Sequence, residues 1–259
     1  REEPMPFAHT AAVASSVVAT MTRMGRGIYT RPAEERPERP LELYEFEGCP
    51  FCRLVREALT ELDLDALVHP CPKGGTRFRP RVVELGGKAQ FPFLVDPNTG
   101  RQLYESADIV AYLFETYGKR PLPAAWRFAS LNAVSSGFAT ISRGGAGSRA
   151  RPSREPAEPL VLYSIESSPF ARLARETLCE LEIPYLLKSM GRTKLKESVP
   201  PPLRERLHLE VEVETHNRRE LEARTGKVMV PYLIDPNTGE EMFESEAIQR
   251  YLERTYAGS

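Results

Sequence analysis

This 259-residue chain has few cysteines, almost no net charge and no long apolar run. Four cysteines in a chain of this length argue against a disulfide-stapled secreted scaffold and favour a reducing compartment. Lys and Arg total 35 against 36 Asp and Glu, and this balance argues against a nucleic-acid partner. No apolar run approaches the roughly 20 residues that a membrane-spanning helix needs. We therefore expect no transmembrane span.

The chain contains two copies of one unit. Pro40–Arg53 returns as Pro159–Arg172, 119 residues later, and Phe91–Gly100 returns as Val230–Gly239, 139 residues later. The second copy therefore carries 20 extra residues between these landmarks, which we place around Lys188–Arg219. Such internal repetition predicts two tandem domains.

A short apolar stretch and a connector rich in Gly, Arg and Pro precede each copy, and Ser15–Arg23 resembles Ser135–Arg143. We expect each stretch to form a helix that caps its own domain, packs against the other copy or lies on a membrane surface. Its polar face lacks the Lys and Arg density of interfacial helices, which favours packing. The predicted organisation is a leader helix and linker over residues 1–40, a first domain over 41–120, a second leader and linker over 121–159, and a second domain over 160–259.

Within the first copy, the pattern predicts the order β-α-β-α-β-β-α, which the second copy repeats. A strand over Leu41–Phe46 leads into a helix from Pro50 to about Leu62. On that helix a predicted core face recurs at helical spacing: Phe51, Val55, Ala58, Leu59 and Leu62. The remaining predicted elements are a strand near Ala66–His69, a short helix around Arg81–Leu85, a hairpin turning at Asp96–Gly100, and a final helix with Ser106 as its cap.

Cys49-Pro50-Phe51-Cys52 lies where the first strand gives way to the first helix. A helix N-terminus presents unpaired N–H groups and partial positive charge, which favour the nucleophilic thiolate of Cys49. Cys52, one turn on, is close enough to resolve a mixed disulfide formed at Cys49. The alternative is a structural pair or half of a zinc site, but zinc would need a second pair of ligands. The other two cysteines, Cys71 and Cys179, form no second motif, so we predict no metal site.

Three landmarks occur in one order: Cys-Pro-Phe-Cys, an apolar residue with Pro92 before a strand, and Glu105-Ser106 at a helix start. This combination resembles the thioredoxin superfamily, specifically glutaredoxins and the N-terminal domain of glutathione S-transferases. The whole chain looks like the tandem proteins of plants and algae, usually targeted to the chloroplast, that join two such domains. The resemblance implies an α/β fold with two tandem thioredoxin-like domains, each preceded by a short helix and a linker. It also implies a chloroplast location, although no transit peptide is visible.

The resemblance assigns the redox chemistry to the first domain. It gives Cys49 the role of nucleophile and Cys52 that of resolving thiol. Pro92 matches a cis-proline that faces the active site. The backbone of Phe91 is expected to pair with the cysteinyl part of glutathione.

The same resemblance places the rest of a glutathione site around the last helix of the first domain. Glu105 and Ser106 match the pair that binds the γ-glutamyl end, where a carboxylate belongs near a helix N-terminus. Ser106 could instead be a plain helix cap. The glycine carboxylate needs a cation, and Arg77, Arg79 and Lys88 are unranked candidates.

The second copy departs from the first at the redox motif. Ser168 stands at the nucleophile position and Ala171 at the resolving position, so no disulfide can form there. Pro231 and Glu244-Ser245 persist, so a glutathione-shaped pocket is a hypothesis for this copy too. Ser168 resembles the serine of plant-type glutathione transferases, but those enzymes also need an all-helical C-terminal domain. We therefore do not expect conjugation here.

The leading hypothesis is a glutathione-dependent thiol–disulfide oxidoreductase that reduces disulfides or removes glutathione from protein thiols through Cys49. The second copy would have a binding, recognition or stabilising role. An alternative of another class is a non-catalytic thioredoxin-fold subunit that docks onto a larger plastid complex. A third is [2Fe–2S] binding through Cys49 and glutathione, with which disulfide formation by Cys52 would compete.

Overall fold

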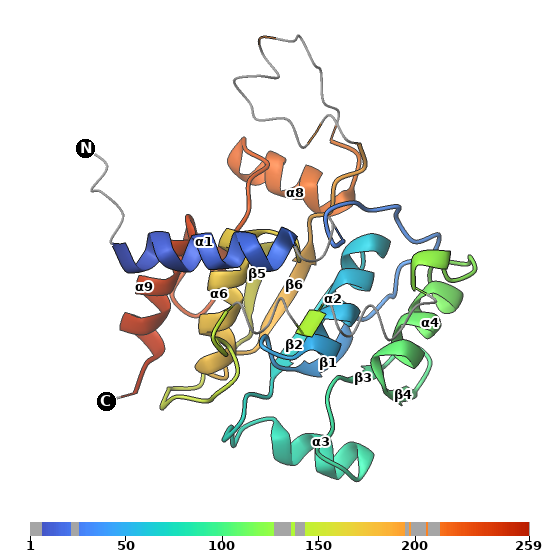
Figure 1. Ribbon diagram of the computed structural model, residues 1–259, viewed down its shortest axis with the longest axis horizontal. Coiled ribbons are helices and arrows are strands. Elements are labelled where there is room, and N and C mark those ends of the chain that lie inside the picture. The colour runs from blue at the N-terminus through green and yellow to red at the C-terminus, as the bar shows by residue number, and fades with distance from the viewer. Residues whose placement is uncertain are drawn as a thin grey trace.

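A computed structural model describes residues 7–21, 26–126, 136–137, 143–194, 197, 206 and 213–258. In this part of the chain eight strands form one sheet in the order β4-β3-β1-β2-β6-β5-β7-β8, with helices packed against both of its faces (Figure 1). Each repeat supplies one half of the sheet. The predicted α/β fold with two tandem thioredoxin-like domains is confirmed.

The first domain follows the predicted order of elements. Its strands are β1 (Leu41–Glu45), β2 (Ala66–Pro70), β3 (Phe93–Asp96) and β4 (Arg101–Tyr104). Its helices are α2 (Pro50–Leu62), α3 (Arg79–Gly86) and α4 (Ser106–Thr116), and a 3-10 turn η1 (Ala124–Trp126) follows. β1 runs parallel to β2 and antiparallel to β3, which pairs in turn with β4. The parallel connection through α2 brings the Cys-Pro-Phe-Cys motif to the carboxyl end of β1.

The second domain repeats this arrangement. Its strands are β5 (Leu160–Ser164), β6 (Tyr185–Ser189), β7 (Tyr232–Asp235) and β8 (Glu240–Phe243). Its helices are α6 (Pro169–Glu180), α8 (His216–Thr225) and α9 (Ser245–Tyr256). Most of the extra residues predicted around Lys188–Arg219 lie outside the described residues.

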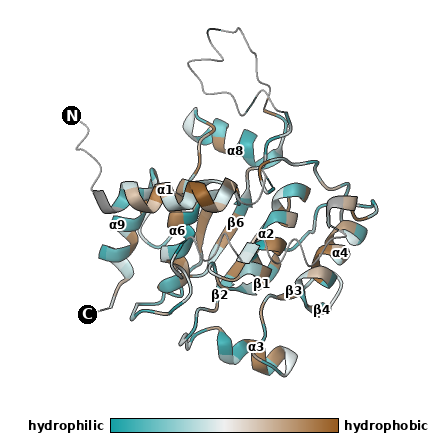
Figure 2. Cartoon of the chain, in the orientation of Figure 1, coloured by the Kyte–Doolittle hydropathy of each residue, from teal (hydrophilic) through white to brown (hydrophobic). Residues whose placement is uncertain are grey.

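Side chains alternate between two apolar layers, one on each face of the sheet. On one face Leu41 and Leu43 of β1 pack with Val55 of α2 and Ile109 of α4. On the other face Tyr44 and Phe93 pack with Val82 of α3. In Figure 2, β6 shows apolar colour, whereas α8 is mostly hydrophilic.

The prediction for Phe51 was wrong. Val55, Ala58, Leu59 and Leu62 of α2 are fully buried, but the Phe51 side chain is 48% exposed. Its counterpart Phe170 is 41% exposed. Phe51 lies in the first turn of α2, and correct helical spacing does not bring this turn into the core.

The two domains are joined through their sheets. β2 pairs antiparallel with β6, and Leu67 stands opposite Leu186, its own equivalent in the repeat. A pseudo-twofold axis therefore passes through this pair of residues. The join was not predicted, because an edge strand and a central strand carry the same alternating pattern.

A buried carboxylate ties the hairpin of each domain to its last helix. Tyr112 of α4 and Tyr117, the residue at the C-terminal cap of α4, donate hydrogen bonds to Asp96 Oδ2 at 2.7 and 2.5 Å. The same arrangement recurs around Asp235 with two tyrosines of α9. These bonds hold the last helix of each domain against the hairpin that precedes it.

The leaders cross between the domains. Helix α1 (Phe7–Met21) precedes the first domain but packs across α6 of the second (Figure 1). Ser16 Oγ donates to the Pro169 carbonyl at 3.0 Å, and Arg172 Nη1 donates to the Ser16 carbonyl at 2.7 Å. In reverse, Ser136 of the second leader donates to the Pro50 carbonyl of the first domain at 2.7 Å. Packing against the other copy, one of the three predicted alternatives, is therefore what α1 does.

The connectors after the leaders cross as well. Thr30 N donates to the Arg192 carbonyl of the second domain at 2.7 Å, and Lys73 N of the first domain donates to the Ser148 carbonyl at 2.7 Å. Each domain is therefore completed by chain that precedes the other. Among the described helices, none is long and apolar enough to cross a membrane.

Candidate redox site and its counterpart in the second domain

Cys49 is the N-cap of α2. Its backbone is extended (φ −82°, ψ 122°), Pro50 follows at the first helical position, and the Cys52 N–H donates to Cys49 Sγ at 3.3 Å. Gly48 lets the crossed connector approach the start of this helix closely: a Cβ at this position would lie 2.0 Å from Ser148 Oγ. The strand-to-helix geometry predicted for the motif is therefore present, with the sulfur directed at the helix N-terminus.

The two thiols of the motif differ in acidity. A hydrogen bond from the Cys52 side chain lowers the pKa of Cys49 despite its burial, and the backbone N–H groups of Cys52 and Phe51 and the charge of Arg56 lower it further. Burial raises the pKa of Cys52 well above its ordinary value, and the hydrogen bond to Cys49 adds to the rise. Such a pair has one thiol ready to attack and one held in reserve.

The motif lies close beneath the surface. Cys49 is 4% exposed and Cys52 fully buried, while Phe51 between them is largely exposed. Both cysteines are free thiols. Access to Cys49 Sγ is therefore narrow, and Phe51 forms an apolar surface beside it.

Four of the residues predicted to bind glutathione lie near the N-terminus of α4, because Phe93 pairs with Tyr104 across β3 and β4: Phe91, Pro92, Glu105 and Ser106. The Phe91–Pro92 peptide bond is cis, as predicted. Glu105 has a positive φ of 63° and is the N-cap of α4, so Ser106 is the first helical residue and not the cap. Gln90, which is not among the predicted site residues, donates a hydrogen bond to the Glu105 carboxylate. Among the described residues the Ser106 hydroxyl has no hydrogen-bond partner.

The structure distinguishes the three cation candidates. Arg77 donates to the carbonyls of Leu181, Glu182 and Ser153 at 2.8, 3.0 and 2.5 Å, so its guanidinium is committed to the second domain. Arg79 donates to the Pro72 carbonyl, and its guanidinium carbon lies 4.8 Å from the centre of the Phe91 ring. Lys88 Nζ lies 4.5 Å from the centre of the Tyr104 ring.

The second domain keeps the backbone of this site, but α1 lies on it. Ser168 is the N-cap of α6, and the Val230–Pro231 peptide bond is cis. The Ser245 hydroxyl, which corresponds to that of Ser106, lies 3.3 Å from His9 Nε2 of α1. Thr20 of α1 donates at 2.7 Å to the carbonyl of Ser167, next to Ser168. The position at which a ligand would meet the second Glu-Ser pair is therefore taken by the leader.

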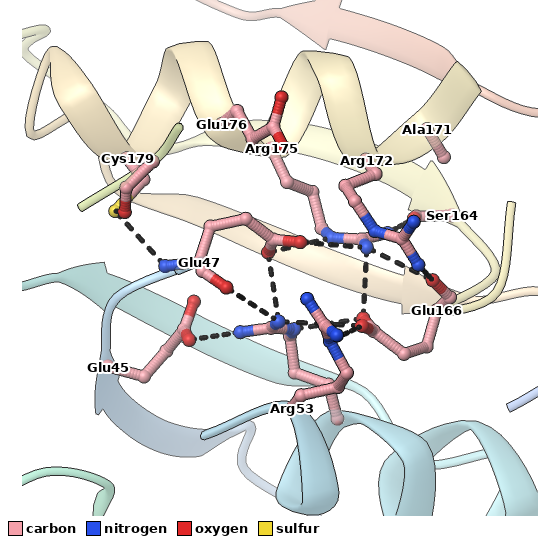
Figure 3. Close-up of polar contacts among 12 residues, drawn as sticks. Glu45, Glu47, Arg53, Ser164, Glu166, Ala171, Arg172, Arg175, Glu176 and Cys179 are labelled. Carbon is pink, nitrogen blue, oxygen red and sulfur yellow. Dashed lines mark hydrogen bonds and ion pairs between the residues drawn. The ribbon is translucent and has the colours of Figure 1, made fainter. Parts of the chain in front are cut away.

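A cluster of buried charges lies between the two domains, directly behind the motif (Figure 3). Arg56 of α2 binds Glu166 of the other domain at 2.9 Å, and Arg175 of α6 binds Glu47 at 3.0 Å. These are reciprocal pairs, because Arg175 and Glu166 repeat Arg56 and Glu47 at a spacing of 119. The members, none more than 4% exposed, are Glu45, Glu47, Arg53, Arg56, Glu166, Arg172 and Arg175.

One member of the cluster breaks its symmetry. Arg56 also contacts Glu45, at the carboxyl end of β1, whereas Arg175 donates at 2.7 Å to the hydroxyl of Ser164, the equivalent residue of β5. Burial raises the pKa of Glu45 to about 8, in spite of the Arg56 charge. Burial also disfavours ionisation of Glu166, but Arg175 and Arg56 outweigh it and lower that pKa to about 2.

The remaining cysteines are buried and weakly acidic. Burial raises the pKa of both Cys71 and Cys179, so neither is expected to be a reactive thiol. Cys179 is held by hydrogen bonds from the Glu47 N–H and to the Gly147 carbonyl, each 3.3 Å long. Within the described residues, no group of three or more His, Cys, Asp or Glu side chains is arranged to hold a metal ion.

Both halves of the chain match one family model. The model of the glutathione S-transferase N-terminal domain matches residues 43–121 and again residues 162–259. No curated protein sequence matches the chain.

Three solved structures are similar to parts of the chain. A glutathione transferase of Bombyx mori is 30% identical, covering 33% of this chain and 39% of that one, with a TM-score of 0.29. A delta-class glutathione transferase of Nilaparvata lugens is 31% identical, covering 31% and 38%, with a TM-score of 0.26. A trimeric glutathione transferase of Leishmania is 15% identical, covering 85% and 68%, with a TM-score of 0.29. The chain thus spans about two fifths of the length of the first two.

Proposed function

Since the chain belongs, in both of its halves, to the glutathione S-transferase N-terminal domain family, we propose that it is a glutathione-dependent thiol–disulfide oxidoreductase. The chemistry resides in the first domain. Cys49 attacks a disulfide or a glutathionylated cysteine, and Cys52 or glutathione then releases the mixed disulfide. The substrates are protein thiols and disulfides.

The observation that carries this proposal is the contrast between the two thiols at the start of α2. Cys49 has a lowered pKa and is stabilised by the Cys52 side chain and by helix N–H groups, while the pKa of Cys52 is raised. A thiolate held at a helix N-terminus is a better nucleophile and a better leaving group than an ordinary thiol. The second domain, with Ser168 and Ala171 at these positions, takes no part in the chemistry.

Glutathione is proposed to bind across Phe91, Pro92 and the N-terminus of α4. The Ser106 hydroxyl is available to the γ-glutamyl carboxylate, and Glu105 is positioned for the ammonium group. For the glycine carboxylate we propose Arg79, beside Phe91. Lys88 is a second cation near this end, and Arg77 is left out because its guanidinium already donates to three carbonyls.

The second domain is proposed to be a scaffold. Its Glu244-Ser245 pair and Ser168 resemble a glutathione site, but α1 contacts Ser245 and the loop before Ser168. The Arg and Glu cluster joins this domain to the back of the redox motif. A chloroplast location stays a prediction from the resemblance.

One observation favours a second candidate function, a non-catalytic subunit that docks onto a larger plastid complex. Cys49 is only 4% exposed, so the site is less open than a freely accessible thiol. A docking subunit would show no turnover with glutathione and would purify with a stoichiometric complex. The same assay therefore separates the two candidates.

The test is turnover of a glutathionylated peptide with glutathione as the reductant. We expect Cys49→Ser to abolish turnover, and Cys52→Ser to retain part of it, because glutathione can release the substrate from Cys49. Cys179→Ser is the matched control, since a serine preserves both hydrogen bonds of that buried residue. Full turnover by Cys49→Ser would show that the mechanism is wrong.

A further inference from the structure

An exposed pair of basic residues lies beside the redox motif, and the proposed reaction has so far given it no role. Lys73 follows the carboxyl end of β2, and Arg149 belongs to the connector that precedes the second domain. An isolated parallel bridge joins them: Lys73 N donates to the Ser148 carbonyl at 2.7 Å, and Ala150 N donates to the Lys73 carbonyl at 3.0 Å. The connector thus holds Arg149 directly opposite Lys73.

This bridge places two like charges side by side. Residues directly opposite each other on neighbouring strands extend their side chains to the same face. Like charges in such positions destabilise the pairing. Both side chains are exposed, and among the described residues neither Lys73 nor Arg149 forms an ion pair with a carboxylate. An anion from outside the chain would relieve this repulsion.

The connector also brings the basic pair to the motif. The Gly48 N–H donates to the Gly147 carbonyl at 3.2 Å, and a Cβ on Gly48 would lie 2.0 Å from Ser148 Oγ. Gly48 directly precedes Cys49, and Ser148 directly precedes Arg149. The two residues in contact are therefore the immediate neighbours of the nucleophile and of the basic pair.

The order of the strands places the pair on the opposite side of Cys49 from Phe91 and Pro92. β1 lies between β3 and β2 in the sheet. The start of β3, the end of β1 and the end of β2 meet at one edge, because β3 runs antiparallel to β1 and β2 runs parallel to it. Phe91 and Pro92 precede β3, whereas Lys73 follows β2. A mixed disulfide whose glutathione half lies before β3 leaves the β2 side of Cys49 to its protein half.

The second domain has the same bridge without the second positive charge. There Tyr29 of the first connector pairs with Arg192, the residue 119 positions after Lys73. A tyrosine thus stands where the first domain has Arg149. The connectors and their bridges occur in both domains, but the paired charges occur beside the motif that keeps its cysteines. This difference indicates a role in binding thiol substrates and not in joining the domains.

We propose that Lys73 and Arg149 recognise acidic residues that flank the target cysteine of a glutathionylated protein. This inference rests on the function proposed above and specifies its substrate class. Arg149 offers a guanidinium, which binds a carboxylate through two parallel hydrogen bonds. Cys49 Sγ attacks the glutathione sulfur and forms a disulfide with it, and the bond from that sulfur to the protein breaks. The protein leaves as a thiolate, which takes a proton from solvent.

The test compares three glutathionylated peptides that differ only in the residues flanking the cysteine, which are glutamate, glutamine or lysine. Turnover with glutathione as the reductant gives kcat/KM for each. In the full wild-type chain we expect the glutamate peptide to exceed the glutamine peptide by about tenfold at low salt, since exposed charge pairs contribute modestly. Added salt should reduce the difference. Lys73→Gln with Arg149→Gln should abolish this preference, and Lys73→Glu with Arg149→Glu should transfer it to the lysine peptide.

The substitutions leave the hydrogen bonds of the bridge in place, because both residues form it through backbone atoms. Arg101→Gln with Lys227→Gln is the matched control. It removes the same net charge at two exposed positions, one at the start of β4 and one in the second domain. This control should keep the wild-type preference.

Three outcomes would overturn the inference. The first is an absence of preference in the wild-type chain, and the second is an unchanged preference when Lys73 and Arg149 are both glutamine. The third is an equal loss of turnover with all three peptides, since the pair would then act on glutathione itself or on the fold. Failure of the proposed function would appear differently, as no turnover of any of the peptides by the wild-type chain.

Discussion

The hydrogen bond between the two thiols of the motif is the largest cause of the low pKa of Cys49, ahead of the helix N–H groups. The position of Cys49 as N-cap alone is thus not the main source of its acidity. The second domain has the cap without the partner thiol, because Ser168 has the same cap geometry as Cys49 but Ala171 stands at the position of Cys52. The acidity of Cys49 depends on its partner thiol.

Cys52→Ala is therefore expected to raise the pKa of Cys49 towards that of an ordinary cysteine. A thiol reacts as its thiolate, so the midpoint of the pH profile for alkylation should move to higher pH in the variant. The measurement is the rate of alkylation of Cys49 by iodoacetamide as a function of pH, followed by peptide mass spectrometry. Cys71, with its raised pKa, provides the control within the same molecule and should stay slow throughout. An unchanged midpoint would mean that the helix alone sets the acidity.

At the scale of the element, α4 and α9 begin alike but differ in what meets their first residues. Glu105 and Glu244 both have a positive φ, and a serine follows each. Both serines are buried, Ser106 at 7% and Ser245 at 2% exposed. The Ser106 hydroxyl has no partner among the described residues, whereas the Ser245 hydroxyl lies 3.3 Å from His9 Nε2 of α1. The hydroxyl of Ser106 therefore keeps its hydrogen-bonding capacity for a ligand, and that of Ser245 is covered by α1.

The chain is accordingly expected to bind one glutathione and not two. Ser106→Ala should weaken binding about tenfold or more, as for the loss of a hydrogen bond to a charged group. Ser245→Ala, the matched change in the second domain, should leave the affinity unchanged. Isothermal titration calorimetry measures both the stoichiometry and the dissociation constant. Two equivalent sites, or an equal effect of both substitutions, would contradict the covering of the second site by α1.

Element by element, the sequence predicts most of what forms locally. β1, β2, the turn at Asp96–Gly100 and the start of α2 at Pro50 lie where alternation, turn residues and an N-terminal proline place them. Phe51 is the exception, since periodicity shows which face of a helix is apolar but not which turns of that face are covered. Ser106 is a second exception, because Glu105, which has a positive φ, is the N-cap of α4 and Ser106 is the first helical residue.

What the sequence does not predict is how the two copies meet. Arg53 and Arg56 have the three-residue spacing of a solvated helix face, and only the three-dimensional structure buries them. The sequence does contain a signal of this burial: both arginines and Glu47 recur in the second copy, whereas charges on a solvated surface need not be repeated. The pairing of β2 with β6 and the crossing of the leaders carry no comparable signal, because they depend on the docking of whole domains.

At the scale of the molecule, the buried charges bind the two domains into one cooperative unit. Glu166 contacts arginines from both domains, Arg56 and Arg175, and is buried with them. Removing one partner of a buried ion pair leaves charge uncompensated, which typically costs about 3–5 kcal/mol. The effect should therefore reach both domains.

Glu166→Gln is expected to lower the free energy of unfolding by about 3–5 kcal/mol. The folded-state pKa of Glu166, about 2, lies below its ordinary value of 4.5, so its ionised form stabilises the fold above pH 4.5. This contribution is lost as the pH falls from 4.5 towards 2, and the gap between wild type and variant should narrow over that interval. Urea denaturation between pH 3 and pH 7 measures it. Glu240→Gln, in the exposed hairpin of the second domain, is the control and should behave as wild type at every pH.

The crossing of the leaders makes the two halves of the chain interdependent. If the domains merely followed one another, a cut between them would release two self-sufficient proteins. Here each half would carry away the segment that shields its neighbour and would lack the segment that shields itself. The single polypeptide is thus organised like a dimer whose subunits exchange their N-terminal segments and are joined covalently. Two fragments made separately should regain the native arrangement only when they are mixed.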